Sequence, residues 1–220
     1  MATILEAINT QIGPEPARLP DGRFQDLLTE EEWEDLPEPV QKRFSRRVKG
    51  GATIVYVGKI RVMKMNRLGR ILTNLLRPFG APLPLYSDIG TPTVVSVTED
   101  ASTGGQIWTR LYANRHGFPQ MVHSAKRFSG PTGLEEYVGY GVSIALKVRV
   151  RGKRLSFESA GYYCKLFGKK IRIPRALMPL DLVVTHEACG RDWFTFSLNL
   201  SAPLFGTLIY QEGLYGEERQ

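Results

Sequence analysis

Cysteine and long apolar runs are scarce in this chain of 220 residues, and each scarcity excludes a class of protein. The two cysteines, Cys164 and Cys189, lie in separate segments without CxxC spacing, so the sequence predicts neither a disulfide framework nor a thiolate zinc site. No run approaches the roughly 18 apolar residues that a membrane-spanning helix needs. The stretch from Met1 to Pro20 lacks the basic start and apolar segment of a signal peptide, and we therefore expect a cytoplasmic location.

Motifs that bind nucleotides or metals, or that activate a serine, are absent too. The sequence has no GxGxxG after a strand, no Walker loop and no GxSxG elbow. Its His, Cys, Asp and Glu residues show no metal-ligand spacing, so we expect neither a cofactor nor a metal. Tyrosines occur among the basic residues, but no RNP or helix-turn-helix pattern accompanies them, which argues against nucleic-acid binding.

Acidic residues are missing from one long stretch, although the net charge of the chain is only +7. Residues 39–87 include eleven basic residues and no acidic one, and residues 143–175 include ten basic residues beside Glu158 alone. Two such segments predict a cationic face for a phosphate-bearing ligand, an anionic membrane surface or RNA. The alternative is a set of solvated outer strand faces.

The remaining composition is typical of one folded domain. Apolar residues make up 42% of the chain and charged residues 23%, close to the averages for globular proteins. The length suits one hydrophobic core. We predict an N-terminal tail over residues 1–22 with a short helix around Ile4–Ile8, a single β-rich domain over residues 23–216, and a C-terminal tail over residues 217–220.

Helix signals occur at three places before residue 78. Thr29 followed by Glu32 fits a capping box that opens a short helix, and a second helix is predicted from Pro39 to Lys49. Asn66 is the predicted cap of the most amphipathic helix. Its apolar stripe consists of Leu68, Ile71, Leu72, Leu75 and Leu76, with Arg67, Arg70 and Arg77 beside it. We expect this stripe to pack on the core, and the alternative is an interfacial membrane helix.

The rest of the chain is a series of strand patterns separated by short turns, as antiparallel meanders require. The predicted strands are Thr53–Lys64, Thr93–Thr98, Gln106–Tyr112, Gln120–Phe128, Leu134–Val150, Arg154–Cys164, Leu182–Glu187, Trp193–Leu200 and Thr207–Tyr215. We therefore predict an α+β, mostly β fold: a strongly curved antiparallel sheet or barrel of about nine strands with two or three helices. A split sandwich is the competing architecture.

The longest alternation runs from Leu134 to Val150 and predicts one long strand. One of its two rows is apolar except for Glu136, and the same row holds Tyr140. A carboxylate that faces an apolar interior is costly unless paired, and burial raises its pKa towards the range useful for acid or base catalysis. Glu136 is therefore a candidate catalyst, and the alternative is a structural ion pair with Lys126 or Arg127.

A histidine lies on the preceding strand. Alternation places His123 and Arg127 on one face and Lys126 on the other, and a turn over residues 129–133 would pair this strand with Glu136 and its neighbours. We predict that His123 and Glu136 form a proton-transfer pair. The predicted substrate-binding residues are Lys126, Arg127, Glu135, Tyr137, Tyr140 and, in the last strand, Tyr210.

One long run, from Gly117 to Gly139, reads GFPQMVHSAKRFSGPTGLEEYVG. It resembles a bacterial domain family of unknown function whose members stand alone or lie C-terminal to saccharopine-dehydrogenase-like oxidoreductases. Shorter matches at Phe24–Leu28, Gly69–Leu72, Pro82–Leu85 and Pro203–Ile209 extend the resemblance over about Arg23 to Tyr215. The resemblance implies an oxidoreductase as a partner, and it includes in the family pattern His123, Lys126, Arg127, Glu135, Glu136 and Tyr137.

Two functions are compatible with these patterns. In the first, the β domain binds a small, largely apolar organic or lipid-like molecule in a cavity and carries out cofactor-free isomerisation or cyclisation through His123 and Glu136. In the second, the domain is a noncatalytic module that docks on an oxidoreductase or on an anionic membrane through its basic face. A closed apolar cavity would favour the first function, and a filled interior with a flat cationic patch would favour the second.

Overall fold

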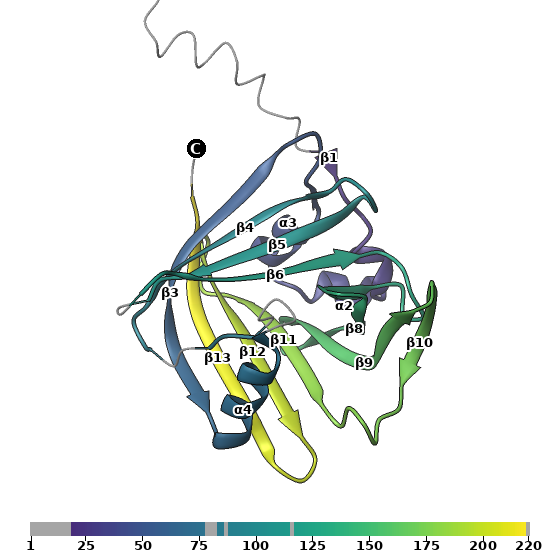
Figure 1. The fold of residues 1–220 in the computed structure, drawn as a ribbon. Helices are drawn as coiled ribbons and strands as arrows, with labels where there is room; N and C mark the ends of the chain where they lie inside the picture. The colour runs from purple at the N-terminus through teal and green to yellow at the C-terminus, as the bar shows by residue number, and fades with distance from the viewer. Residues whose placement is uncertain (1–18, 78–82, 86–87, 115–116, 219–220) are drawn as a thin grey trace, which may run out of the picture.

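The computed structural model describes residues 19–77, 83–85, 88–114 and 117–218 of the chain. The predicted tail helix at Ile4–Ile8 therefore lies outside the described residues. Figure 1 shows a strongly curved antiparallel sheet that closes on itself, with short helices at two places on its periphery. The predicted class, a mostly β fold with a few helices, is confirmed, and the sheet is a barrel, not a sandwich.

Ten strands form the closed barrel, and each pairs antiparallel with the next along the chain. The last strand returns to pair with the first, which closes the sheet without free edges. In chain order they are β3 (Thr53–Met65), β4 (Pro92–Asp100), β5 (Gly105–Tyr112), β6 (Gln120–Arg127), β7 (Glu135–Gly139), β8 (Val142–Arg151), β9 (Arg154–Leu166), β11 (Asp181–Ala188), β12 (Trp193–Ala202) and β13 (Gly206–Glu217).

The prediction of one strand from Leu134 to Val150 is wrong. The segment folds as the hairpin β7–β8, in which Glu136 lies opposite Ile144. Three successive residues at the turn, Gly139, Tyr140 and Gly141, have positive φ, a conformation that glycine adopts without strain. The apolar alternation continues through the turn because both arms point their alternate side chains into the same barrel, so the period alone could not reveal the break.

A further strand that the sequence did not predict, β10 (Lys169–Ile173), forms a hairpin with the end of β9 and extends beyond the barrel. Its residues are mostly exposed, so it lacks the alternation of a strand that packs on a core. Phe167 and Gly168 form the tight turn of this hairpin, and both have positive φ. The two-residue strands β1 (Leu19–Pro20) and β2 (Arg46–Arg47) make a separate small sheet.

Two short helices, α2 (Glu30–Glu34) and α3 (Glu38–Phe44), cover one end of the barrel together with the 3-10 turn η1 (Gln25–Leu27). The predicted capping box is present, since Thr29 and Glu32 exchange their side-chain and backbone hydrogen bonds. Helix α3 ends five residues earlier than predicted because Arg46 and Arg47 enter the small sheet. Phe24 and Phe44 insert between the strands at this end, with ring centroids 5.2 Å apart.

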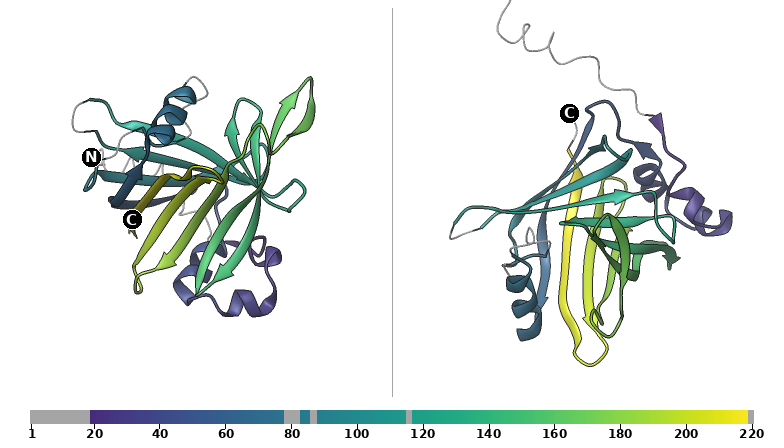
Figure 2. Two further views of the ribbon diagram at one scale, coloured as in Figure 1. Left: turned by 90° about the horizontal axis from the view of Figure 1, so that it is seen from below. Right: turned by 45° about the vertical axis from the view of Figure 1, so that its right-hand side comes forward.

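Helix α4 (Arg67–Leu75) lies on the other side of the molecule, as both views in Figure 2 show. Its predicted cap is confirmed, because the Gly69 amide donates to Asn66 Oδ1 over 2.8 Å. The helix packs on β13, as predicted, but through Gly69, Thr73 and the half-buried Leu72, so most of the leucine and isoleucine stripe is exposed. A Cβ on Gly69 would lie only 2.2 Å from the carbonyl oxygen of Leu208, so the small residue permits this close approach.

An up-and-down barrel places its connections alternately at two ends. One end, here called the capped end, holds the turns covered by η1, α2 and α3. At this end Arg23 Nη1 donates to the carbonyl oxygen of Gly104 in the β4–β5 turn over 2.7 Å. The other end, called the far end, holds five connections that follow β3, β5, β7, β9 and β12. They are residues 66–91, 113–119, 140–141, 167–180 and 203–205.

Candidate functional site

Strand register decides which of the predicted site residues face the barrel interior. Lys126 lies opposite Glu136, and both side chains are buried within the barrel. Arg127 lies opposite Glu135, and this pair belongs to the outer face. The same alternation puts His123 on the outer face of β6, where its side chain is exposed.

A cluster of charged side chains lies in the middle of the interior. Lys126 Nζ donates a short hydrogen bond to Glu136 Oε2, and Arg110 Nη2 lies 4.0 Å from Glu136 Oε1. Arg110 also donates to Ser124 Oγ over 3.1 Å. Two cations therefore share one carboxylate, and no second carboxylate among the described residues of the interior balances the extra positive charge.

Burial and charge act against each other on the two pKa values of this pair. Burial alone would raise the pKa of Glu136, but the charges of Lys126 and Arg110 and the hydrogen bond from Lys126 outweigh it, so the pKa lies below its ordinary value. Burial lowers the pKa of Lys126 more than the attraction of Glu136 raises it. The carboxyl group is therefore an ionised ion-pair partner and not a raised-pKa acid.

On the capped side of the cluster the interior is filled by aromatic rings around His186. The His186 ring lies 5.0 Å from the rings of Phe44 and Phe196 and 6.0 Å from that of Phe157. Neither ring nitrogen has a hydrogen-bond partner among the described residues. Burial, followed by the charges of Arg43, Lys126 and Arg110, lowers the pKa of His186 well below its ordinary value, so the ring is neutral.

On the far side of the cluster most inward side chains are buried too, such as Ile209 at 0% and Leu200 at 3% exposure. Leu198 and Val142 occupy inward positions of β12 and β8 but are only half-buried, whereas Leu155 and His186 on the capped side are 0% exposed. The side chains of Arg110 and Glu136 each keep 11% of their accessible surface.

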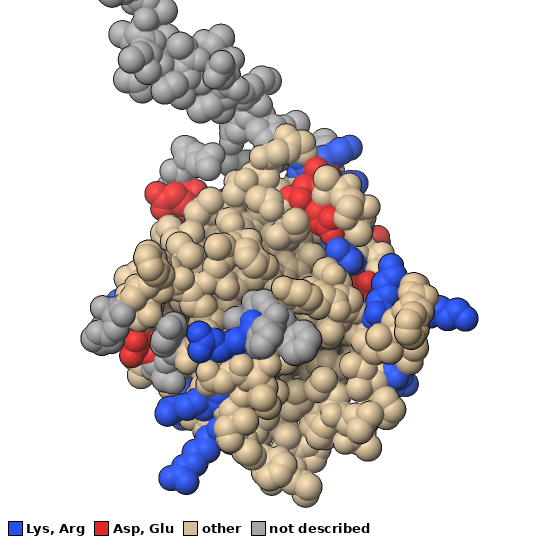
Figure 3. Space-filling view, viewed as in Figure 1, with Lys and Arg blue, Asp and Glu red and all other residues tan. Residues whose placement is uncertain are grey.

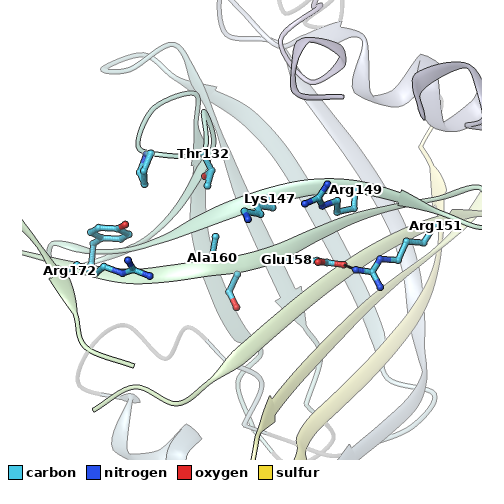
Figure 4. Close-up of a pocket in the computed structure, with 10 residues that line it drawn as sticks. Thr132, Lys147, Arg149, Arg151, Glu158, Ala160 and Arg172 are labelled. Carbon is cyan, nitrogen blue, oxygen red and sulfur yellow. Dashed lines mark ion pairs between the residues drawn. The ribbon is translucent and has the colours of Figure 1, made fainter. Parts of the chain in front are cut away.

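A second candidate site lies on the outer face of β8 and β9 (Figure 4). It is an open groove of about 480 Å³, and it is lined by four cationic side chains with a single acid. The cations are Lys147, Arg149, Arg151 and Arg172, and the acid is Glu158. Arg151 Nη2 pairs with Glu158 Oε1 over 2.9 Å, so three of the four cations remain available to an anion.

The structure brings together only part of the predicted site. The predicted adjacency of His123 and Glu136 is wrong, because odd-numbered residues of β6 point out of the barrel while Glu136 points in. His123 instead lies beside Thr109 on the outer wall, with Nδ1 and Oγ1 3.3 Å apart. The alternative reading of Glu136, an ion pair with Lys126, is the arrangement observed.

The other predicted residues are distributed over the outer surface. Arg127 pairs with Asp100 over 3.1 Å and lies over the ring of Tyr137. Glu135 accepts from Lys170 and from Ser129. Tyr140 occupies the exposed β7–β8 turn, and Tyr210 donates to Glu212 Oε2 over 2.9 Å, away from the interior. Their arrangement supports the wall of the barrel and not a shared pocket.

Sequence reasoning missed the central residue of the interior cluster, Arg110. Its signal was present, because Arg110 lies between Trp108 and Tyr112 in an inward row of β5 that is otherwise buried. An arginine in such a row needs a buried partner. That partner, Glu136, lies two strands away, and the pairing depends on the register of both hairpins.

Metal and membrane-spanning features are not found in the described part of the chain. No three His, Cys, Asp or Glu side chains of the described residues are grouped so that they could hold a metal ion. No described helix has the length and apolar character needed to cross a bilayer. The two cysteines are free thiols.

Comparison with known proteins identifies the chain at the level of a domain family. The model of a domain of unknown function, DUF4166, matches residues 36–214, which include every strand of the barrel except the last three residues of β13. No curated protein and no solved structure gives a significant match to the chain.

Proposed function

Since the chain belongs to the DUF4166 family, a domain of unknown function, we propose a function from geometry: the barrel binds an amphipathic small molecule with an anionic head group, such as a long-chain carboxylate. The head group would lie against Arg110, and the apolar part would lie along the far half of the interior. The observation that carries this proposal is the surplus positive charge of the interior cluster, together with the half-buried Leu198 and Val142 among the inward residues of the far half.

Barrel width supports a ligand in the interior. Eight strands give an interior that side chains can just fill, and the diameter grows with strand number. In this ten-stranded barrel the capped half is filled by residues from outside the sheet, Phe24, Val40 and Phe44. The far half receives no insertion from α2 or α3. Leu83 packs on the core from the connection after β3, and the inward Leu198 and Val142 keep accessible surface.

Charge supports an anionic head group. Arg110 shares Glu136 with Lys126, which is much closer to the carboxylate, so the guanidinium retains unused donors. A ligand carboxylate can accept two parallel hydrogen bonds from an arginine, and such charged hydrogen bonds are roughly twice as strong as neutral ones. Binding would neutralise the interior cluster. The proposal contains no proton-transfer step, because His123 and Glu136 lie on opposite faces of the wall.

Titration with oleate and with oleyl alcohol tests the proposal. Arg110→Gln should weaken oleate binding by about 10- to 100-fold, the range expected for a hydrogen bond to a charged group, and should leave the alcohol unaffected. Arg149→Gln removes a cation from the outer groove and serves as the matched control. Absence of oleate binding by the unmodified protein, or equal loss in both variants, would contradict the proposal.

The outer groove favours a second candidate function, in which its cations bind an acidic surface of a saccharopine-dehydrogenase-like oxidoreductase. Three cations on one rigid wall suit an anionic patch and give association that weakens with salt. Lys147→Glu combined with Arg149→Glu should abolish association with an oxidoreductase of this class from the same organism. Association that persists in the double variant would remove this candidate.

A further inference from the structure

Exposed apolar side chains are concentrated at the far end of the barrel. Among the described residues, every large hydrophobic side chain that is more than half exposed lies in a far-end connection. These side chains are Ile71, Leu75, Ile89, Phe118, Tyr140, Phe167, Leu177, Leu204 and Phe205. Each of the five connections contributes at least one of them, so the far end carries a rim of apolar tips.

The amphipathic helix of this rim presents its stripe outward. Leu75 is 65% exposed and Ile71 56% exposed, although both belong to the stripe that a soluble protein would normally turn inward. Arg67 and Arg70 lie on the next arc of the same helix. A helix with an outward apolar stripe beside arginines is the pattern of an interfacial helix.

A hairpin turn on the same rim also places an exposed apolar side chain beside basic residues. Phe167 at the tip of the β9–β10 hairpin is fully exposed, and Lys165 and Lys169 flank it in the two strands. The left view of Figure 2 shows this hairpin and α4 projecting on the same side of the barrel, opposite α2 and α3. The β12–β13 turn adds Leu204 and Phe205 beside the start of α4, where Asn66 Nδ2 donates to the carbonyl oxygen of Thr207.

The charge of the rim indicates what covers it. The described residues of the five far-end connections include seven lysine or arginine residues and one carboxylate, Asp88, and two of the seven cations, Lys170 and Arg175, pair with carboxylates of neighbouring strands. In the view of Figure 3, lysine and arginine side chains lie at the lower left and right margins of a face with few acidic residues. Each basic residue near an anionic bilayer contributes about 1 kcal/mol of attraction. The rim is therefore complementary to a negatively charged surface.

We propose that the far-end rim docks on an anionic lipid bilayer, with the apolar tips inserted among the acyl chains and the basic residues against the lipid phosphates. Separate tips on five connections suit a fluid surface, which adapts to each tip, whereas a protein partner would need a matching pocket for each. Docking does not depend on the proposed ligand site. It would, however, place the far half of the interior next to the lipid from which an amphipathic ligand could enter.

Co-sedimentation with vesicles tests the docking surface. The full chain should bind vesicles of phosphatidylcholine mixed with phosphatidylglycerol and should bind pure phosphatidylcholine at least tenfold more weakly. Phe167→Ser combined with Leu204→Ser should reduce binding to the mixed vesicles at least tenfold, because both side chains are exposed and their apolar surface is buried only on insertion. Arg67→Glu combined with Arg70→Glu should do the same through charge.

Matched controls separate the rim from the rest of the surface. Trp193→Ser changes an apolar side chain that is 48% exposed at the capped end, and Lys147→Glu combined with Arg149→Glu changes cations on the outer wall. Both controls should bind mixed vesicles as the unmodified protein does. No binding to mixed vesicles, or equal losses in controls and rim variants, would overturn the proposal. The proposal would also be overturned if the protein did not bind vesicles but self-associated, and the rim variants abolished that self-association. The rim would then bind a second copy of the chain.

The same variants distinguish this proposal from the ligand site. Arg110→Gln should bind mixed vesicles normally, because Arg110 is buried at the centre of the barrel. The Phe167→Ser and Leu204→Ser variant should retain its affinity for soluble oleate. Failure of vesicle binding alone would reject the docking surface and leave the ligand site, and failure of oleate binding alone would do the reverse.

Discussion

The two ends of this barrel differ in the charge and the burial of the residues that form them. At the capped end, Phe24 and Phe44 insert from outside the sheet beside the acidic helix α2, and the residues beneath them, such as Leu155 and His186, are completely buried. At the far end, the connections are basic, their apolar side chains face solvent, and the inward Leu198 is only half-buried. The comparison indicates that the two ends differ mainly in what covers them, because far-half inward residues such as Ile209 and Leu200 are as buried as those beneath the helices.

The largest predicted effect is a difference in the cost of one substitution at the two ends. Leu155→Ala should lower the free energy of unfolding by about 3–5 kcal/mol, because it opens a cavity in a close-packed layer. Leu198→Ala removes the same atoms from a half-buried position and should cost roughly 1 kcal/mol. Urea unfolding with matched m-values measures both changes.

Equal costs for the two leucine substitutions would break the comparison, since they would show that Leu198 is packed as tightly as Leu155. The same urea unfolding can be repeated with oleate. The ligand should raise the free energy of unfolding of the unmodified protein and raise that of Leu198→Ala by a smaller amount. Leu155→Ala should keep the full ligand-induced increment, because Leu155 lies on the capped side of the charged cluster.

A smaller effect concerns pH and the histidine of the capped end. The unfolded chain protonates His186 near its ordinary pKa of about 6.5, whereas the folded protein holds that pKa well below this value. The unfolded state therefore binds more protons, so stability is complete above about pH 7 and falls as pH decreases, by up to roughly 1.4 kcal/mol per pH unit. Thermal unfolding between pH 7.5 and pH 5.5 measures the slope.

His186→Leu isolates this contribution. The leucine has a similar volume, does not titrate, and removes two ring nitrogens that lack partners among the described residues. Its stability should equal or exceed that of the unmodified protein at pH 7.5, and its pH dependence should be weaker. The same slope in both proteins would show that His186 is not the group that couples folding to pH.

Sequence reasoning succeeded where the signal is local. The strand periods, the Thr29 and Asn66 caps and the short turns are consequences of neighbouring residues, and they were enough to predict a barrel-like meander. It failed where one sequence pattern is compatible with two different structures. The β7–β8 hairpin keeps the period of a single strand, and the α4 stripe looks alike whether it packs on a core or faces a lipid.

The interior site could be predicted only in part for a related reason. Glu136 and Lys126 were identified because each lies in an inward row next to one hairpin turn. His123 was assigned wrongly because one residue of register moves a side chain to the other face of the wall. Arg110 was missed because its relation to Glu136 depends on the register of two successive hairpins, β5–β6 and β6–β7.

The smallest predicted effect is on the unliganded protein when the surplus charge is removed. Arg110→Gln leaves Lys126 and Glu136 as a balanced pair, so the lost contact to Glu136 at 4.0 Å is offset by the removal of an unpaired buried charge. We expect the free energy of unfolding to change by less than about 1 kcal/mol. Arg110→Lys, which keeps the charge, is the control, and a large loss in Arg110→Gln alone would show that the arginine is a structural member of the cluster, not a free site for an anion.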